Sequence, residues 1–382
     1  MKSERKNKPD NRVEVSWFAP ICNGDDEYLG SHDDKYKSNW KNASKIVKTA
    51  DKLGFNNILC PSSYQVGQDT LTFAAAVAPS LKNISLLPAI RCGEIHPPAL
   101  AKSISTLDNI LKGRLTLNMI SSNLPGTELD SKKRYRRSRE VIQILKEFWN
   151  NDFLNFKGEF YNLKLPSDPV KPYQYGGPLM YFGGYSDEGL NLCAEFCDVY
   201  LMWPEKKESI KNLISQMKIK ARYFKRKVNF GLRVHVIIRE TENEAREYAK
   251  KIISKLDITK GEEIKNRALD AGSLGVSRQS QMIKESDSEY FVEDFLWTGI
   301  GLARSGCGAA IVGDPDQVLK KLKGYIKMGI KSFILSGYPN LKESILFANY
   351  VLPKLDTISL PELYKKIPEG DPLTPLCREK RK

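Results

Sequence analysis

Two residues in the middle of the chain combine a cation and an imidazole at a spacing that suits anion chemistry. Arg233 and His235 stand two apart in the apolar run GLRVHVII. A β-strand directs residues i and i+2 to one face, so both side chains are expected to point into the same interior. Burying a cation there is costly without a partner. The pair predicts either a site for an anion or a structural network that includes a carboxylate.

Two further segments place polar side chains in sequences typical of active-site loops. Arg304 lies in GIGLARSGCGAAIVGDP, whose five glycines indicate a loop, and Tyr338 lies in SGYPNLKES after an apolar run. A guanidinium suits an anion clamp, and a phenol suits a hydrogen bond to substrate. The alternatives are an exposed loop arginine and a tyrosine that only packs.

A glycine pair before a helix predicts a phosphate site. The segment GGYSDEG holds Gly184, Tyr185 and Ser186 where a strand gives way to a helix. Glycines allow close approach to the backbone, and the helix N-terminus offers free N–H groups. Asp187 could instead act only as the helix N-cap.

Strand-like and helix-like segments alternate along the chain. We expect strands at 15–21, 57–61, 85–91, 115–121, 179–183, 199–203, 229–238, 309–312 and 332–336. Helices are expected at 36–53, 70–81, 98–111, 135–149, 188–196, 207–222, 317–328 and 341–355. The strands are short and apolar on both faces, as in a parallel sheet covered by helices.

This alternation predicts an α/β fold, a (β/α)₈ TIM barrel, as a single domain with its core at about 13–356. Residues 151–170 interrupt the rhythm as a hairpin around Lys157-Gly158, and a long helical stretch covers about 242–285. We expect a mobile insertion at about 255–300 and an irregular tail at 357–382. A doubly wound sheet is the alternative, but the first strand-to-helix joint, CNGDDEYLGSHDD, lacks GxGxxG.

A barrel places its active site at the C-terminal ends of the strands. Trp17, Asn118 and Ser121 stand at such ends, as do the residues singled out above.

Composition excludes several classes of function. The net charge of +14 arises from 60 Lys and Arg against 46 Asp and Glu, spread along helical segments as a solvated surface. No nucleic-acid motif occurs, so no nucleic-acid partner is expected. Seven cysteines without CxxC pairs and only three histidines predict no metal site and a reducing cytoplasm. We expect no signal peptide and no membrane span.

With these motifs the chain resembles the alkanesulfonate monooxygenases of the bacterial luciferase-like flavin group, from about Val13 to Asp356. The likeness is carried by WFAP with EYLG, TLDNILKGRLTLNMIS, RY at 134–135, YFGGYSD, RVHVIIRET, WTGIGLARSGCGAAIVGD and LSGYPNLKES.

The resemblance implies a two-component flavin-dependent monooxygenase. A separate NAD(P)H:flavin reductase would supply reduced FMN (FMNH₂), and O₂ would convert an organosulfonate to an aldehyde and sulfite. The implied catalytic residues are Arg233, His235, Arg304 and Tyr338, with His235 positioning or protonating oxygen species. The implied flavin residues are Trp17, Asn118 and Ser121, with Tyr135, Gly184, Tyr185 and Ser186 at the phosphate. Relatives commonly form homo-oligomers.

Two departures leave the substrate open. The family's cysteine after strand two is replaced by SYQVGQDTL, and its TGSDP after strand four is ISSNLPG here. A sulfone, a sulfosugar or a non-sulfur substrate remains an alternative, as does an oxidoreductase that uses the deazaflavin F420. A flavin-binding protein without catalysis is the hypothesis from another class.

Overall fold

Eight parallel strands form a closed barrel. The computed structural model describes residues 10–22, 25–31, 38–63, 67–257, 259, 261–263, 272–304 and 306–370. The barrel strands are, in order around it, β13 (Ile330–Ser336), β1 (Glu14–Phe18), β2 (Asn57–Cys60), β3 (Ser85–Arg91), β4 (Thr116–Ile120), β7 (Leu179–Phe182), β8 (Val199–Met202) and β9 (Asn229–Ile238). Pairing of β9 with both β8 and β13 closes the ring. The predicted (β/α)₈ barrel is confirmed.

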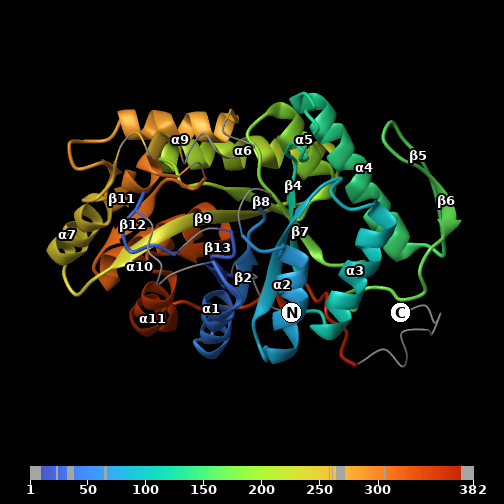
Figure 1. The fold of residues 1–382 in the computed structure, drawn as a ribbon, viewed down its shortest axis with the longest axis horizontal. Helices are drawn as coiled ribbons and strands as arrows, with labels where there is room; N and C mark the ends of the chain where they lie inside the picture. Colours follow the sequence, from blue (N-terminus) through green and yellow to red (C-terminus); the bar gives the residue numbers. More distant parts are fainter. Residues whose placement is uncertain are drawn as a thin grey trace, which may run out of the picture.

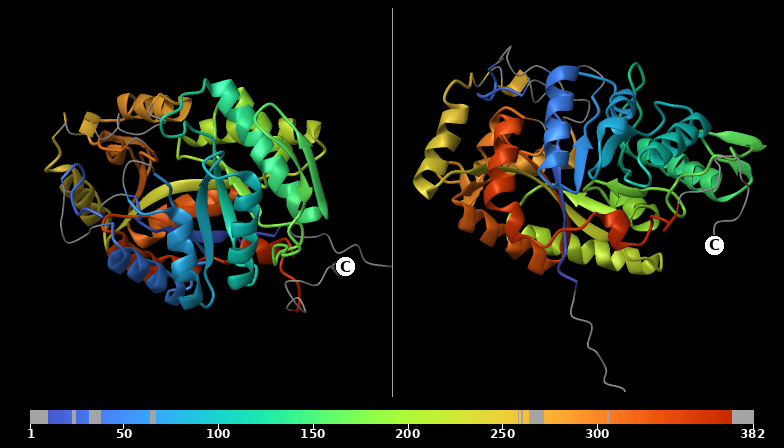
Figure 2. Two further views of the ribbon diagram at one scale, coloured as in Figure 1. Left: turned by 45° about the vertical axis from the view of Figure 1, so that its right-hand side comes forward. Right: turned by 90° about the horizontal axis from the view of Figure 1, so that it is seen from below.

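Helices connect the strands and surround the barrel (Figures 1 and 2). They are α1 (Trp40–Lys52), α2 (Thr70–Val77), α3 (Pro97–Ile110), α4 (Ser131–Asn150), α5 (Asp187–Phe196), α6 (Lys207–Tyr223), α7 (Glu242–Ile253), α10 (Pro315–Met328) and α11 (Asn340–Tyr350). Several begin with a side-chain cap, such as Asn39 before α1 and Asp130 before α4. Such caps satisfy backbone N–H groups that the first helical turn leaves unpaired.

The alternation of side chains along β1 separates the barrel interior from the helix layer. Val15 and Trp17 pack in the large core between strands and helices, where Trp17 contacts Phe55 and Phe347. Phe18, the next residue, belongs to the smaller apolar cluster inside the barrel. All five residues of β1 are buried, because a parallel strand in a barrel is covered on both faces.

A ninth parallel strand lies outside the barrel. β12 (Ala310–Gly313) pairs with the second half of β9, beyond the point where β8 ends. The expected strand at 309–312 is therefore present, but it extends the sheet instead of closing the ring. The extra length of β9, ten residues, provides the pairing edge.

Both segments that interrupt the regular alternation contain secondary structure of their own. The hairpin predicted around Lys157-Gly158 is formed by β5 (Phe153–Lys157) and β6 (Asn162–Pro166), at the opposite end of the molecule from α7 (Figures 1 and 2). Within 255–300, the described residues include helix α9 (Leu274–Lys284), capped by Ser273. Strand β11 (Leu296–Trp297) then continues the sheet antiparallel to β12, and β10 (Phe291–Glu293) pairs antiparallel to β11.

The tail beyond residue 356 covers the end of the barrel at which the strands begin. Residues 371–382 lie outside the described residues, but α12 (Leu360–Leu363) packs against the N-terminal ends of the strands. The backbone N–H of Leu360 donates to Glu14 Oε2 at 3.0 Å, and Ser332 donates to Glu14 Oε1 at 3.0 Å. The Tyr181 hydroxyl also donates to Glu14 Oε1. None of the helices in the described ranges is long and apolar enough to cross a membrane.

We predict that Glu14→Ala destabilises the protein and releases α12. The substitution leaves three buried donors without an acceptor, which should cost at least ~3 kcal/mol of the free energy of unfolding. Urea unfolding measures the loss, and limited proteolysis near residue 360 measures release of the tail. Asp10→Ala removes an exposed carboxylate and should change neither. Unchanged unfolding of Glu14→Ala would contradict this role.

Candidate active site

The predicted Arg233 and His235 pair faces the barrel interior together. Both side chains reach Ser336, which lies beside them on β13. Arg233 Nη2 donates to Ser336 Oγ at 2.7 Å, and His235 Nδ1 lies 2.6 Å from the same oxygen. Their exposed fractions are 4% and 1%. The partner between them is a hydroxyl and not the carboxylate considered from the sequence.

Arg304 and Tyr338 join this group from the loops above the strands. An Nη1–H of Arg304 donates to the Tyr338 hydroxyl. The Tyr338 ring stacks on His235 with 5.4 Å between centroids and 22° between planes. The structure thus brings all four predicted catalytic residues into one cluster at the mouth of the barrel, the end where the strands finish.

A phenyl ring links the two arginines. The guanidinium carbon of Arg233 lies 4.8 Å from the centroid of Phe18, and that of Arg304 lies 5.5 Å from it. A cation over an aromatic face is stabilised by the ring quadrupole. The sequence did not indicate Phe18, because the inward direction of Glu14, with which Phe18 alternates, is known only from its contacts in the structure. The structure does not bring Trp17 to this site, because its ring faces the helix layer.

No acidic side chain of the described residues forms an ion pair with Arg233 or Arg304, although the carboxyl of Asp25 is near enough for Arg304 to lower its pKa. Burial lowers the pKa of Arg233 to about 10, so its guanidinium stays charged near neutral pH. Burial, with Arg233 and Arg304 nearby, lowers the pKa of His235 well below its usual range. The cluster therefore holds two positive charges beside a neutral imidazole, which suits binding of an oxyanion.

The predicted flavin residues approach the mouth from β4 and its neighbours. Asn118 alternates with Thr116, whose hydroxyl accepts a hydrogen bond from Asn57 inside the barrel, so Asn118 faces the interior. Ser121 follows β4, and its hydroxyl is buried without a hydrogen-bond partner among the described residues. Arg137 Nη2 donates a hydrogen bond of 2.8 Å to the backbone carbonyl of the next residue, Ser122. Ser121 thus offers an unused polar group at the mouth.

A small-residue cradle lies between α4 and α5. A Cβ atom on Gly184 would come within 3.2 Å of the Tyr135 hydroxyl, and one on Gly189 within 3.0 Å. Ser186 caps α5 by accepting from Gly189 N–H at 3.2 Å. Tyr135, Gly184 and Ser186 therefore meet at a helix N-terminus, a geometry that fits a phosphate.

The Tyr185 side chain points away from this cradle. Its hydroxyl accepts from the backbone N–H of Trp203 at 2.9 Å, and its ring lies beside Gly275 of α9. Only the backbone of Tyr185 is placed near the cradle. Because β4 and β7 stand across the ring of strands from β9, β13 and β1, the cradle and the arginine cluster lie on opposite arcs of one mouth.

An acid–amide pair adjoins the arginine cluster. Asp25 Oδ1 accepts from both the backbone N–H and the side-chain Nδ2 of Asn340, each at 2.8 Å. Asp25 Oδ2 and Asn340 Oδ1 are buried without a hydrogen-bond partner among the described residues. Burial raises the pKa of Asp25 to about 7, against the opposing effects of Asn340 and Arg304. Sequence reading had passed over Asp25 as part of a polar loop.

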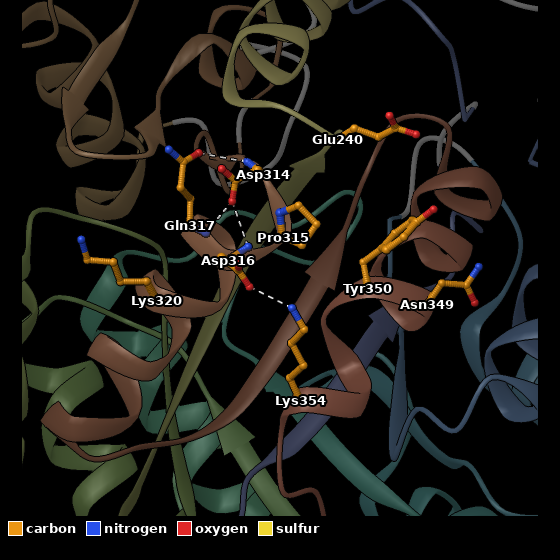
Figure 3. A pocket seen from close by; sticks show the side chains of 9 residues that line it. All are labelled: Glu240, Asp314, Pro315, Asp316, Gln317, Lys320, Asn349, Tyr350 and Lys354. Carbon is orange, nitrogen blue, oxygen red and sulfur yellow. Dashed lines mark hydrogen bonds and ion pairs between the residues drawn. The ribbon is translucent and has the colours of Figure 1, made fainter.

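Neither a metal cluster nor a hollow on the outer surface offers another site. No group of three metal-ligating side chains occurs in the part of the chain that the structure describes. The hollow, about 560 Å³, lies at the start of α10 and the end of α11 (Figure 3). Three of its charged groups are already engaged: Lys354 pairs with Asp316 at 2.8 Å, and Asp314 caps α10. None of the predicted site residues lines it.

Comparison with known proteins fits this arrangement. The family described as luciferase-like monooxygenase matches residues 13–332. The chain belongs to this family. It is therefore an enzyme, a monooxygenase of the flavin-dependent luciferase-like group. The broad resemblance inferred from the sequence motifs is confirmed.

The relatives of this luciferase-like monooxygenase refine that resemblance. The chain is 53% identical over 371 residues to a sulfoquinovose monooxygenase of Agrobacterium fabrum, covering 97% of this chain and 96% of the relative. A second sulfoquinovose monooxygenase, of Novosphingobium aromaticivorans, is 47% identical with 91% and 98% covered. Both relatives are named sulfoquinovose monooxygenases, so the narrower resemblance to alkanesulfonate monooxygenases is not supported.

The fold extends to distant structures. The oxygenating constituent of a diketocamphane monooxygenase of Pseudomonas putida, solved with FMN, aligns with a TM-score of 0.67 and 17% identity, covering 91% of this chain and 100% of that one. At this identity the likeness concerns the fold alone.

We predict that Asp25→Asn makes the protein relatively more stable at alkaline pH. A carboxyl whose folded pKa is raised binds its proton more tightly when folded, so it loses stability as pH rises through 4 to 7. The gain of the variant over wild type should grow by about 2–3 kcal/mol between pH 5 and pH 8. Urea unfolding at both pH values measures it. Asp152→Asn, at an exposed site, is the control, and a difference that does not vary with pH would refute the prediction.

Proposed function

We propose that this enzyme uses reduced FMN and O₂ to cleave the C–S bond of sulfoquinovose, a hexose that carries a sulfonate at C6. The products would be a C6 aldehyde, sulfite, oxidised FMN and water. The carrying observation is the pair of guanidinium groups of Arg233 and Arg304 over Phe18, neither of which forms an ion pair with a carboxylate of the described residues. The names of the two curated relatives support the sugar.

The arginines would bind the sulfonate and stabilise negative charge as sulfite leaves. Preorganised donors of this kind act more strongly in a water-poor site than in solution. Tyr338 accepts its hydrogen bond from Arg304, so the phenol proton is free to be donated to a substrate oxygen. The Phe18 ring fills the space beneath both cations and keeps water from them.

The cradle would hold the flavin phosphate. Tyr135, Gly184 and Ser186, with the backbone of Tyr185, would receive the phosphate, while Asn118 and the unpartnered Ser121 hydroxyl would face the ring. Bound reduced FMN would supply the activation of O₂. A separate NAD(P)H:flavin reductase would deliver it, as the two-component arrangement implies. Trp17 has no place in this site.

The acid–amide pair favours a substrate that carries hydroxyl groups. Asp25 Oδ2 and Asn340 Oδ1 are desolvated without a hydrogen-bond partner, which costs free energy until a partner arrives. Asn340 follows Tyr338 by two residues, and the positive charge of Arg304 acts to lower the pKa of Asp25. A sugar hydroxyl both donates and accepts, so it would satisfy these atoms in either protonation state of Asp25. A simple alkanesulfonate has no such group.

The deciding experiment supplies the purified protein with FMN, an NAD(P)H:flavin reductase and O₂. Sulfite is measured with sulfoquinovose and hexanesulfonate, alkanesulfinate is measured with a dialkyl sulfone, and a parallel set of reactions uses reduced F420 in place of reduced FMN. We expect sulfite from sulfoquinovose with reduced FMN and much less from hexanesulfonate. Absence of sulfite from every sulfonate, or activity with F420 alone, would overturn the proposal.

We predict that Arg233→Met and Arg304→Met each lower kcat/KM for sulfoquinovose by ~10²–10³-fold. This corresponds to about 3–4 kcal/mol, the usual cost of removing one donor to a developing oxyanion. Arg136→Met, which removes an exposed arginine paired with Glu159, is the matched control and should leave kcat/KM unchanged. Wild-type kinetics in either active-site variant would exclude the assigned role.

We predict that Asn340→Ala selectively impairs the sugar substrate. The fall in kcat/KM should be ~10–100-fold for sulfoquinovose, because a buried hydroxyl loses its partner. For hexanesulfonate the change in kcat/KM, or in its inhibition constant if it is not turned over, should stay within about threefold. Asn349→Ala, at an exposed position of the same helix, is the control. Equal losses for both compounds would show that Asn340 only supports Tyr338.

A further inference from the structure

We propose that Ser336 is a positioning residue of this site: it holds the Arg233 guanidinium and fixes His235 as a neutral imidazole protonated on Nε2. The inference rests on the proposed function for its effect on turnover. Its structural part, the state of His235, is testable without flavin or substrate.

The Ser336 hydroxyl joins β13 to two side chains of β9. Ser336 is 1% exposed at the last position of β13. It lies 2.7 Å from Arg233 Nη2 and 2.6 Å from His235 Nδ1. His235 Nε2 in turn lies 3.2 Å from the backbone carbonyl of Cys307, in the loop before β12.

The donor and acceptor capacities of these groups assign each proton in the series of hydrogen bonds. A carbonyl oxygen only accepts, so His235 Nε2 must carry the proton that reaches Cys307. A guanidinium only donates, so Ser336 Oγ accepts from Arg233 and keeps its own proton for another partner. Among the hydrogen-bond partners of Ser336 Oγ in the described residues, only His235 Nδ1 can accept that proton, so we assign Nδ1 as unprotonated. This chain of hydrogen bonds runs from the Arg233 guanidinium through the Ser336 hydroxyl and the His235 ring to the backbone carbonyl of Cys307.

The surrounding charges favour the same state. The groups that face His235 are Arg233 on its own strand, Arg304 and Tyr338 from the loops above, and the Cys307 thiol. Two of these are cations, and the thiol is kept protonated because burial raises its pKa. An imidazolium would add a third positive charge beside Arg233 and Arg304, against both burial and repulsion.

This arrangement limits what His235 does in the reaction. Both ring nitrogens are engaged, so the imidazole neither donates a proton from Nδ1 nor accepts one at Nε2 without breaking the chain. Of the two roles considered from the sequence, positioning is favoured over protonation. Ser336 accepts from Arg233 Nη2, and the carbonyls of Val234 and Ile334 accept from Nη1, which leaves the Nε–H and the second Nη2–H for the sulfonate.

Selective ¹³C,¹⁵N-histidine labelling tests the tautomer directly. The chain has only three histidines, at 32, 96 and 235, and His235→Gln assigns the signal. In the flavin-free protein we expect the Nε2–H tautomer with no protonation step between pH 5.5 and 8. An imidazolium at pH 6–7, or the Nδ1–H tautomer, would overturn the proposal whatever the substrate proves to be.

Ser336 variants test the positioning role. Ser336→Ala should shift the His235 signals, introduce a protonation step on the acid side, and lower kcat ~10–100-fold with a smaller change in KM. Ser336→Thr keeps the hydroxyl and should restore the His235 signals. Ser344→Ala removes another buried serine hydroxyl, bonded to Leu341 O, and is the matched control.

The outcomes separate the inference from the function. Normal His235 signals and an unchanged pH profile in Ser336→Ala would refute the positioning role, even if thermal stability falls as in Ser344→Ala. If the tautomer and its dependence on Ser336 hold but no sulfonate yields sulfite, the proposed function fails and the structural inference stands.

Discussion

Two guanidinium groups over one phenyl ring, not ion-paired with any acidic side chain among the described residues, set the character of this site. Water normally stabilises such charges, but Arg233 is almost fully buried. The barrel compensates with fixed dipoles: the carbonyls of Val234 and Ile334 accept from Arg233 Nη1 at 3.1 and 3.3 Å. Neutral acceptors leave the positive charge available, whereas a carboxylate would cancel it. The mouth can therefore stabilise an anion.

The sequence predicted the features that follow from strand periodicity and missed those that depend on register. The spacing of Arg233 and His235 was sufficient to place them on one inner face, since it concerns a single strand. Choosing Trp17 over Phe18 was wrong for the opposite reason: a strand buried on both faces gives no polar–apolar alternation to indicate which side is inside. Glu14 shows which face of β1 is inside the barrel, but only once its partners on β7 and β13 are known.

Ser336 and Asp25 show a second limit of sequence reasoning. Ser336 contacts His235 because β13 and β9 are paired in register, although the two residues are 101 positions apart. Asp25 belongs to a loop with several acidic residues, and only its contact with Asn340 distinguishes it. In the same way, β12 fits the strand pattern but lies outside the ring, because the length of β9 offers it an edge. Local patterns predict elements, while pairing decides their neighbours.

The buried ionisable groups near the mouth keep different charges for a common physical reason. Burial disfavours every charged form, but the pKa that a group has in water decides whether it loses its charge near neutral pH. Arg233 starts so high that a pKa of about 10 still leaves it cationic. His235 starts near neutrality and becomes neutral, while Asp25, raised to about 7, is poised between its two forms. Because only the arginines hold full charge, the strongest attraction in the mouth is directed at an oxyanion. The remaining polar groups can then discriminate by hydrogen bonding without competing for that charge.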